Sequence, residues 1–353
     1  MSRFCSQALS AMAAYVPGEQ PRDQRYIKLN TNESPYPPPP CVVNALGKAE
    51  LEDLRLYSDP ECTALKAAIA AQYGVGTKNV FLSNGSDEIL NFAFMAYGHL
   101  GAVFPDITYG FYSVFANLYG VSTEIVPLRE DFTLDREAFC GKNRLVVLAN
   151  PNAPTGIALS LPQLEQIIGS NPDGVVIVDE AYVDFGAKSA VGLLEKYPNL
   201  LVVQTFSKSR SMAGARLGFG FANPELIADL EKIKYSTNPY NLDRMTQIVG
   251  TAAMTDPAYF QENCRKIMET RAYVKAELER LGFTVTDSRA NFLFAKSDRV
   301  DGRSLYLELK QRGILIRHFD SPRIKDYNRI TVGSRREMER FLQTVAQILG
   351  GQL

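Results

Sequence analysis

The chain has 353 residues, of which 46% are hydrophobic and 22% charged, so it holds apolar material for about two domains of roughly 150 residues. Its 38 Lys and Arg nearly balance its 39 Asp and Glu, and a net charge of -1 lacks the basic excess of a nucleic-acid-binding surface. No window approaches about 18 uncharged apolar residues, and the N-terminus lacks the apolar run of a signal peptide. We therefore expect a cytoplasmic globular protein without a nucleic-acid or membrane partner.

Histidine and cysteine are sparse. The chain has two histidines, far apart in the sequence, and five cysteines that form no CxxC pair: Cys5, Cys41, Cys62, Cys140 and Cys264. A structural zinc site needs about four clustered ligands, so no metal site is expected. An odd number of scattered cysteines is typical of a reducing compartment.

The first predicted elements lie between residues 35 and 97. The proline-rich run 35–40 predicts an extended connection, because proline lacks an amide hydrogen and fixes φ. Asp59 and Pro60 predict the start of a helix, and Gly74 predicts its end. A short strand, a polar turn and a buried helix are then expected at 80–82, 84–88 and 89–97.

Three further runs rich in Val, Leu and Ile predict strands at Leu145–Ala149, 175–178 and 200–204. Their nearly continuous hydrophobicity is typical of strands buried on both faces. Strand and helix patterns alternate from about residue 60 to about residue 240. This alternation predicts an α/β domain with a mostly parallel sheet covered by helices.

The pattern changes after about residue 241. A long helix is expected to begin at Asp256 and Pro257 and to end near Gly282. Strands are expected after it at 283–286, 291–295, 314–317 and 329–332, and helices at 303–312 and 335–349. This α+β segment of roughly 110 residues is large enough to be a domain. We expect an N-terminal arm at 1–40, a large domain at 41–245 and a small α+β domain at 246–353.

Polar residues follow two of the predicted strands. Asp179 and Tyr182 come after the strand at 175–178, and Thr205, Ser207 and Lys208 come after the strand at 200–204. A single aspartate in this position usually caps a helix or closes a turn, and a single lysine is usually solvated. In open α/β sheets, however, ligands bind at the carboxyl ends of the strands, so the two ends predict a shared site.

The spacing of these residues resembles that of a known family. Asp179-x-x-Tyr182, Ser207-Lys208 and then Arg216 resemble the fold type I pyridoxal-phosphate enzymes, and the segment 207–218 is similar to the lysine signature of class II aminotransferases. Residues 29–35 (LNTNESP) and 329–333 (RITVG) are similar to the histidinol-phosphate aminotransferase family. The resemblance covers nearly the whole chain and implies a fold type I architecture, with a large α/β domain and a smaller α+β domain.

The resemblance implies roles around pyridoxal 5'-phosphate. Lys208 would hold the cofactor as an imine and later carry a proton. Asp179 would keep the pyridine nitrogen protonated, and Tyr182 would donate to the 3-oxygen. Further residues are expected to hold the phosphate, partly through backbone amides at a helix N-terminus: Ser207, Arg216, Thr205, Gly85, Ser86 and Asp87.

Two tyrosines also follow from the resemblance, and one motif departs from it. Tyr109 would stack on the cofactor ring, and Tyr57 would cross a dimer interface to the neighbouring cofactor phosphate. The loop 150–156 is similar to the family's Asn-Pro-Thr-Gly loop, but Ala153 stands directly before Pro-Thr-Gly. Either Asn152 reaches the 3-oxygen or Tyr182 contacts it alone; our interpretation favours Asn152.

The resemblance also implies the substrate residues and the reaction. Arg317 and Arg329 would bind a substrate phosphate or carboxylate, and Tyr15, Asn32 and Asn291 would line the same pocket. We expect a homodimer with shared sites that exchanges an amino group between histidinol phosphate and 2-oxoglutarate, giving imidazole acetol phosphate and glutamate.

Other functions stay open at this point. An aromatic amino-acid aminotransferase and a decarboxylase of a phosphorylated amino acid would use the same cofactor. A non-catalytic regulatory relative usually carries a DNA-binding domain, which we do not expect before Leu29, and Lys208 also argues against it. A dinucleotide enzyme is disfavoured because no GxGxxG follows a strand.

Overall fold

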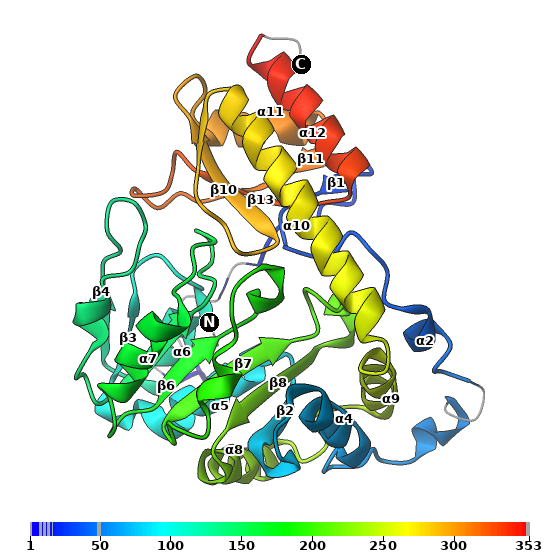
Figure 1. Cartoon of the computed structure of the whole chain (residues 1–353), viewed down its shortest axis with the longest axis vertical. Coiled ribbons are helices and arrows are strands. Elements are labelled where there is room, and N and C mark those ends of the chain that lie inside the picture. The colour runs from blue at the N-terminus through cyan, green and yellow to red at the C-terminus, as the bar shows by residue number, and fades with distance from the viewer. Residues whose placement is uncertain are drawn as a thin grey trace.

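The computed structural model describes residues 2–6, 9, 12, 15, 17–47 and 51–350. At its centre is a seven-stranded sheet in the order β2-β8-β7-β6-β5-β3-β4 (Figure 1). The strands are β2 (Val80–Asn84), β3 (Ala102–Pro105), β4 (Thr123–Val126), β5 (Leu145–Ala149), β6 (Val176–Asp179), β7 (Leu200–Thr205) and β8 (Leu217–Ala222). Only β8 is antiparallel to its neighbours; the other pairs are parallel.

Both faces of this sheet are buried, as the continuous apolar runs predict. In β5, Val146 and Leu148 join one hydrophobic cluster, whereas Leu145 and Val147 join the cluster on the opposite face. Helices cover the sheet: α4 (Thr63–Tyr73), α5 (Ser86–Tyr97), α6 (Phe111–Tyr119), α7 (Leu161–Gly169), α8 (Pro224–Thr237) and α9 (Arg244–Ala253). A short α2 (Pro40–Val43) precedes them, and 3₁₀ helices lie at Asp53–Arg55, Thr77–Asn79, Gly98–Leu100, Arg136–Phe139, Val183–Phe185, Ala190–Leu193 and Ala213–Ala215.

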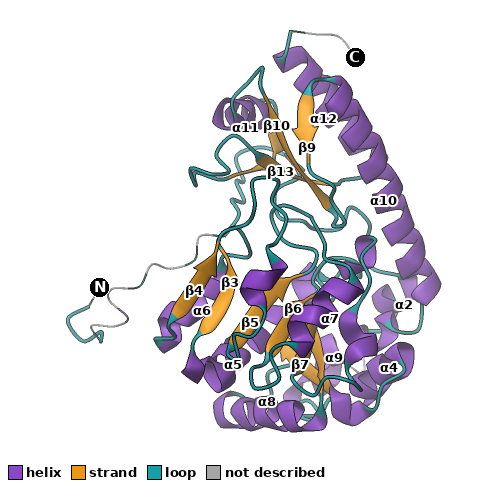
Figure 2. Ribbon diagram, turned by 60° about the vertical axis from the view of Figure 1, so that its left-hand side comes forward, coloured by secondary structure: helices purple, strands orange, loops and turns teal. Residues whose placement is uncertain are grey.

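The C-terminal part of the chain forms a four-stranded antiparallel sheet in the order β12-β13-β10-β9. Its strands are β9 (Phe283–Val285), β10 (Phe292–Ser297), β12 (Arg317–His318) and β13 (Asn328–Thr331). It is flanked by α10 (Pro257–Arg280), α11 (Gly302–Gln311) and α12 (Arg335–Ile348). Figures 1 and 2 show α10 running from this sheet down beside α9 and α2.

The N-terminal arm takes part in the C-terminal packing. Its strand β1 (Ile27–Lys28) pairs in parallel with β11 (Ile314–Leu315), and Leu29 is buried in the core beside the C-terminal helices. The single strand expected at 314–317 is therefore divided: β11 pairs with the arm, whereas β12 pairs with β13.

The start of one predicted helix differs from the structure. The helix expected from Asp59 and Pro60 begins instead at Thr63, whose backbone N–H donates to the Asp59 carboxylate at 2.8 Å. Gly74 closes this helix with φ of +67°, as predicted. The domain division remains a prediction; its boundary at 245/246 falls inside α9, where Ala253 packs in the core of the large sheet. Within the described residues, no helix is long and apolar enough to cross a membrane.

Candidate active site

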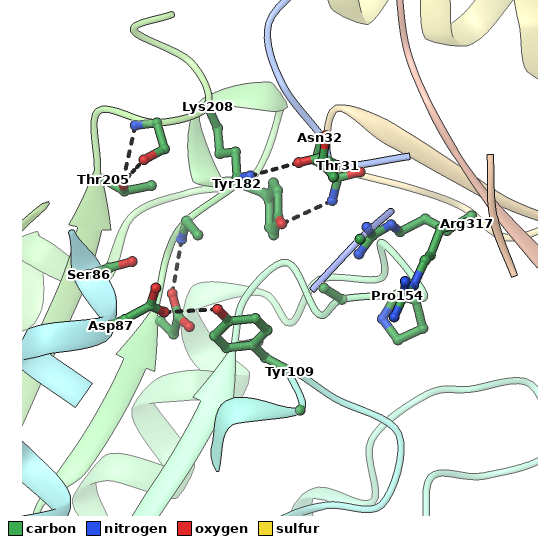
Figure 3. A pocket seen from close by; sticks show the side chains of 18 of the residues that line it. Thr31, Asn32, Ser86, Asp87, Tyr109, Pro154, Tyr182, Thr205, Lys208 and Arg317 are labelled. Atoms are coloured by element: carbon green, nitrogen blue, oxygen red, sulfur yellow. Dashed lines mark hydrogen bonds between the residues drawn. The ribbon is translucent and has the colours of Figure 1, made fainter. Parts of the chain in front are cut away.

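The carboxyl ends of the parallel strands open into a cavity of about 520 Å³ (Figure 3). Because β5, β6 and β7 are neighbours and parallel, the residues that follow them meet at one edge of the sheet. The arm and the C-terminal strands close the other side. Of the predicted site residues, the cavity is lined by Tyr15, Asn32, Ser86, Asp87, Tyr109, Asp179, Tyr182, Thr205, Ser207, Lys208, Arg216, Arg317 and Arg329.

Lys208 presents its amine to this cavity. Its Nζ donates to the Thr31 backbone carbonyl at 3.0 Å and lies 5.9 Å from the centre of the Tyr182 ring. Burial, together with the charge of Arg329, lowers the pKa of this lysine to about 8. A substantial fraction of the amine is therefore neutral near pH 7 to 8, as a nucleophile or a base requires.

Asp179 ends β6 and is buried in the cavity floor. Its Oδ2 accepts a hydrogen bond from the Tyr112 hydroxyl at 2.8 Å, and its Oδ1 accepts one from the Ala181 backbone at 3.2 Å. Burial raises the pKa of this carboxyl to about 6, against the opposing effect of the bond from Tyr112. An anion held in this way needs a cationic partner in the cavity.

The N-terminus of α5 forms an anion-binding corner. No side chain of the residues that the structure describes caps its first turn, and Gly85 precedes it with φ of +74°. A Cβ at Gly85 would lie 2.5 Å from Nη2 of Arg216, so glycine lets the guanidinium reach the helix end. Arg216 also approaches Ser207 Oγ at 3.5 Å. Uncapped amides beside a guanidinium suit a phosphate.

Asp87 connects two walls of the cavity. Its Oδ1 accepts from the Tyr109 hydroxyl at 2.8 Å, and its Oδ2 lies 3.5 Å from the Arg216 guanidinium. The predicted role of Asp87 rests on its backbone amide, whereas its side chain positions Tyr109 and Arg216. At the end of β7, the hydroxyl of Thr205 donates to Ser207 Oγ at 3.0 Å.

The loop after β5 places Ala153, rather than Asn152, at the cavity. The Asn152 amide donates to Ile107 O at 2.9 Å and to Thr155 Oγ1 at 3.1 Å, and its oxygen accepts from Thr108. Its polar atoms are therefore used within the loop, and the structure does not support our preference for Asn152. The Asn150–Pro151 and Ala153–Pro154 peptides of this loop are both cis.

Two arginines enclose the substrate side. Arg329 on β13 donates to the Asn30 carbonyl at 2.9 Å, and its buried Nε has no hydrogen-bond partner among the described residues. Arg317 on β12 pairs in register with Arg329, and the ring of Phe319 lies 5.7 Å from the Arg317 guanidinium and 5.9 Å from that of Arg329. Burial lowers the pKa of Arg329. A buried guanidinium without a carboxylate partner suits an anionic ligand.

Two other predicted residues lie elsewhere. Asn291 is fully buried and absent from the cavity lining; it donates to the Asn32 backbone carbonyl at 3.0 Å. Its side chain thus supports Asn32, and its substrate contact remains a prediction. Tyr57 is 79% exposed, stacks on Tyr240 at 4.5 Å between ring centres, and also does not line this cavity.

The structure adds residues that the sequence analysis missed. Glu33 and Phe319 line the cavity, Thr31 accepts from Lys208, and Tyr112 holds Asp179. Only Glu33 and Thr31 carried a signal, because both lie within the LNTNESP motif. Tyr112 has the spacing of a core residue on an amphipathic helix and gives no separate sign of its contact.

These residues fit pyridoxal phosphate. The α5 corner and Arg216 suit its phosphate, Asp179 suits its pyridine nitrogen, and Lys208 suits its aldehyde. An α/β sheet with such a strand-end site defines the class of protein: an enzyme that holds a phosphorylated cofactor through a lysine.

The comparisons with known proteins agree with this class. The model of the family aminotransferase class I and II matches residues 24–345, so the chain belongs to that family. Histidinol-phosphate aminotransferase of Clostridium acetobutylicum is 47% identical over 351 residues, covering 99% of this chain and 100% of that protein. The protein of the same name from Marinomonas sp. is 50% identical over 345 residues, covering 96% and 97%.

A solved structure shows the same fold. Histidinol-phosphate aminotransferase from Sinorhizobium meliloti, in complex with pyridoxal-5'-phosphate, superimposes with a TM-score of 0.88 at 22% identity, covering 99% of this chain and 98% of that chain. The predicted fold class is confirmed.

Proposed function

We propose that this chain is a pyridoxal-phosphate-dependent aminotransferase that exchanges an amino group between L-histidinol phosphate and 2-oxoglutarate. The observation that carries the proposal is Lys208, a partly neutral amine in a cavity that also holds Asp179 and an anion-binding corner. The names of full-length relatives at 47% and 50% identity support this substrate pair.

Each group of the cofactor has a proposed partner. Arg216, Ser207 and the first amides of α5 hold the phosphate, and Asp179 pairs with the pyridine nitrogen. Tyr182 donates to the 3-oxygen. Bound there, pyridoxal phosphate draws electrons from the substrate and makes the hydrogen on its Cα acidic.

Lys208 performs the proton transfer. A neutral Nζ accepts the Cα proton and later returns it, and burial holds its pKa at about 8, near the working pH. The Thr31 carbonyl, 3.0 Å away, orients the amine toward the cavity.

The two substrates use one anion site. Histidinol phosphate carries a terminal phosphate and 2-oxoglutarate a distal carboxylate, and Arg329 and Arg317 offer guanidinium donors to both. Tyr15 is 38% exposed at the mouth of the cavity, where it packs on Phe111 at 4.1 Å between ring centres, and so contacts the substrate from the arm.

We further propose a cytoplasmic homodimer. Tyr57 lies in an exposed apolar segment, which a second copy of the chain would cover. Tyr57 would then lie near the cofactor phosphate bound by that second copy. The exposed apolar side chains of the segment are Val43, Leu51, Leu54, Leu56 and Tyr57.

One assay separates this function from the two alternatives. The loaded enzyme is incubated with 2-oxoglutarate and either histidinol phosphate or phenylalanine, and glutamate is measured; carbon dioxide release is measured with a phosphorylated amino acid. We expect the highest kcat/KM with histidinol phosphate. A higher value with phenylalanine would indicate an aromatic aminotransferase, and carbon dioxide release without glutamate a decarboxylase.

A further inference from the structure

Asn32 lies where the arm, the C-terminal sheet and the large sheet meet. It is 1% exposed and adopts a left-handed backbone conformation, with φ of +57°, that asparagine tolerates better than most residues. Its backbone carbonyl accepts from Asn291, and its backbone N–H donates to Thr331 Oγ1 at 3.0 Å. These bonds place the Asn32 side chain against Tyr182 in the cavity wall (Figure 3).

The hydrogen bonds also determine which way the Asn32 amide points. Thr331 Oγ1 already accepts from the Asn32 backbone, so its own proton needs an acceptor, and Asn32 Oδ1 lies 2.9 Å away. The amide nitrogen therefore points to the Tyr182 hydroxyl, to which it donates at 3.0 Å. Because Tyr182 Oη accepts this bond, its single proton is free to point into the cavity.

In the loop after β5, Ala153 stands where the family motif has an asparagine, so this position has no side-chain amide. Ala153 packs with the rings of Tyr182 and Phe292 and offers no polar group. The Asn152 amide is held within its own loop. The amide that bonds Tyr182 is instead that of Asn32.

We propose that Asn32 is a positioning residue: its amide donates to Tyr182 and directs the tyrosine's proton to the 3-oxygen of the bound cofactor. The inference rests on the proposed function and changes the predicted role of Asn32, from a substrate contact to a support for Tyr182. Burial raises the pKa of Tyr182, whereas the charge of Arg329 and the bond from Asn32 oppose this rise, so the bond makes this tyrosine a better donor.

The test is a spectroscopic titration of the enzyme loaded with pyridoxal phosphate. A hydrogen-bond donor to the 3-oxygen stabilises the deprotonated form of that oxygen. Losing the donor therefore raises the pH at which the visible absorption band is half titrated. Asn32→Gly removes the amide but permits the positive φ, and we expect a rise of about half to one pH unit. Asn32→Asp keeps the acceptor for Thr331 and loses the donor, so its midpoint rises at least as much.

Thr331→Val is the matched variant, because it keeps the Asn32 amide but removes the hydroxyl that orients this amide and accepts from the Asn32 backbone. We expect a smaller rise in the same direction. In all three variants kcat falls, whereas KM for both substrates stays within about twofold, as expected of a residue that acts through Tyr182.

Two results would overturn the inference. An unchanged midpoint in Asn32→Gly and Asn32→Asp would show that the amide does not act on the cofactor. A rise in KM with an unchanged midpoint would make Asn32 a substrate contact. If the wild-type protein with pyridoxal phosphate shows no visible imine band, the proposed function fails first, and the inference fails with it.

Discussion

The hydroxyl of Tyr112 on α6 donates to the carboxylate of Asp179 at the end of β6, with 2.8 Å between the oxygens. Tyr112 is fully buried and Asp179 is 5% exposed. The Ala181 backbone holds the second carboxylate oxygen, so both oxygens are fixed before any ligand binds. The sheet thus presents a preorganised anion to the cavity, and this arrangement has consequences for stability and for cofactor binding.

Asp179 should destabilise the cofactor-free protein above about pH 6. Its pKa of about 6 in the folded chain lies above the ordinary 3.8, so between these values the folded state binds more protons than the unfolded state, and stability falls as pH rises. Asp179→Asn should therefore stabilise the cofactor-free protein by about 3 kcal/mol at pH 7 and by little below about pH 4. Urea unfolding at both pH values measures this difference, and an equal gain at both would contradict it.

Tyr112→Phe should weaken cofactor binding. Without the donor, the pKa of Asp179 rises further, and its neutral form pairs poorly with the pyridine nitrogen. A bond to a charged group is worth about 1.5 to 3 kcal/mol, so the Kd for pyridoxal phosphate should rise at least about tenfold near pH 6 and less near pH 9. Tyr119→Phe on the same helix, whose hydroxyl bonds Asn91, is the control. Equal Kd values for both variants would remove Tyr112 from the site.

The sequence predicts the strand-end residues better than it predicts their partners. Asp179 and Lys208 follow continuous apolar runs, and parallel strands bring such ends together, so local pattern was sufficient for both. Tyr112 and Asn291 act through contacts with residues 67 and 259 positions away, and no local pattern encodes such pairs. For Asn152, the family motif suggested a cofactor contact, but nearby groups in the loop satisfy its amide.

The same limit applies to the fold. The apolar periodicity predicts the order and type of most elements. The division of 314–317 between two sheets, however, depends on the arm pairing with β11, a contact between segments nearly the whole chain apart.

Arg329→Ala should weaken the binding of both substrates. The variant removes a buried guanidinium whose Nε has no partner in the described part of the chain, and a bound phosphate or carboxylate then loses its charged donor. The loss is on the order of 3 kcal/mol, or about a hundredfold in KM for each substrate. Steady-state kinetics measures it, with the exposed Arg340 on α12 replaced by Ala as the control. A rise in KM for only one substrate would show that the substrates do not share the arginine.

Mixing two inactive variants tests the proposed dimer. If Tyr57 serves the partner's site, Lys208→Ala and Tyr57→Asp each inactivate their own homodimer. After subunit exchange, one site of each heterodimer carries both defects and the other carries neither. About half of the molecules are then mixed, so activity should return toward about a quarter of wild type. Exchange that is measured directly but restores no activity would show that Tyr57 does not complete the partner's site.

The central claim is that Lys208 holds the cofactor in this cavity. Borohydride reduction of the enzyme loaded with pyridoxal phosphate, followed by peptide mapping, tests it most directly. We predict one modified peptide, labelled at Lys208, with loss of the visible band; Lys208→Ala should bind the cofactor without stable labelling. A label on a different lysine, or visible absorption that borohydride leaves unchanged, would contradict the account.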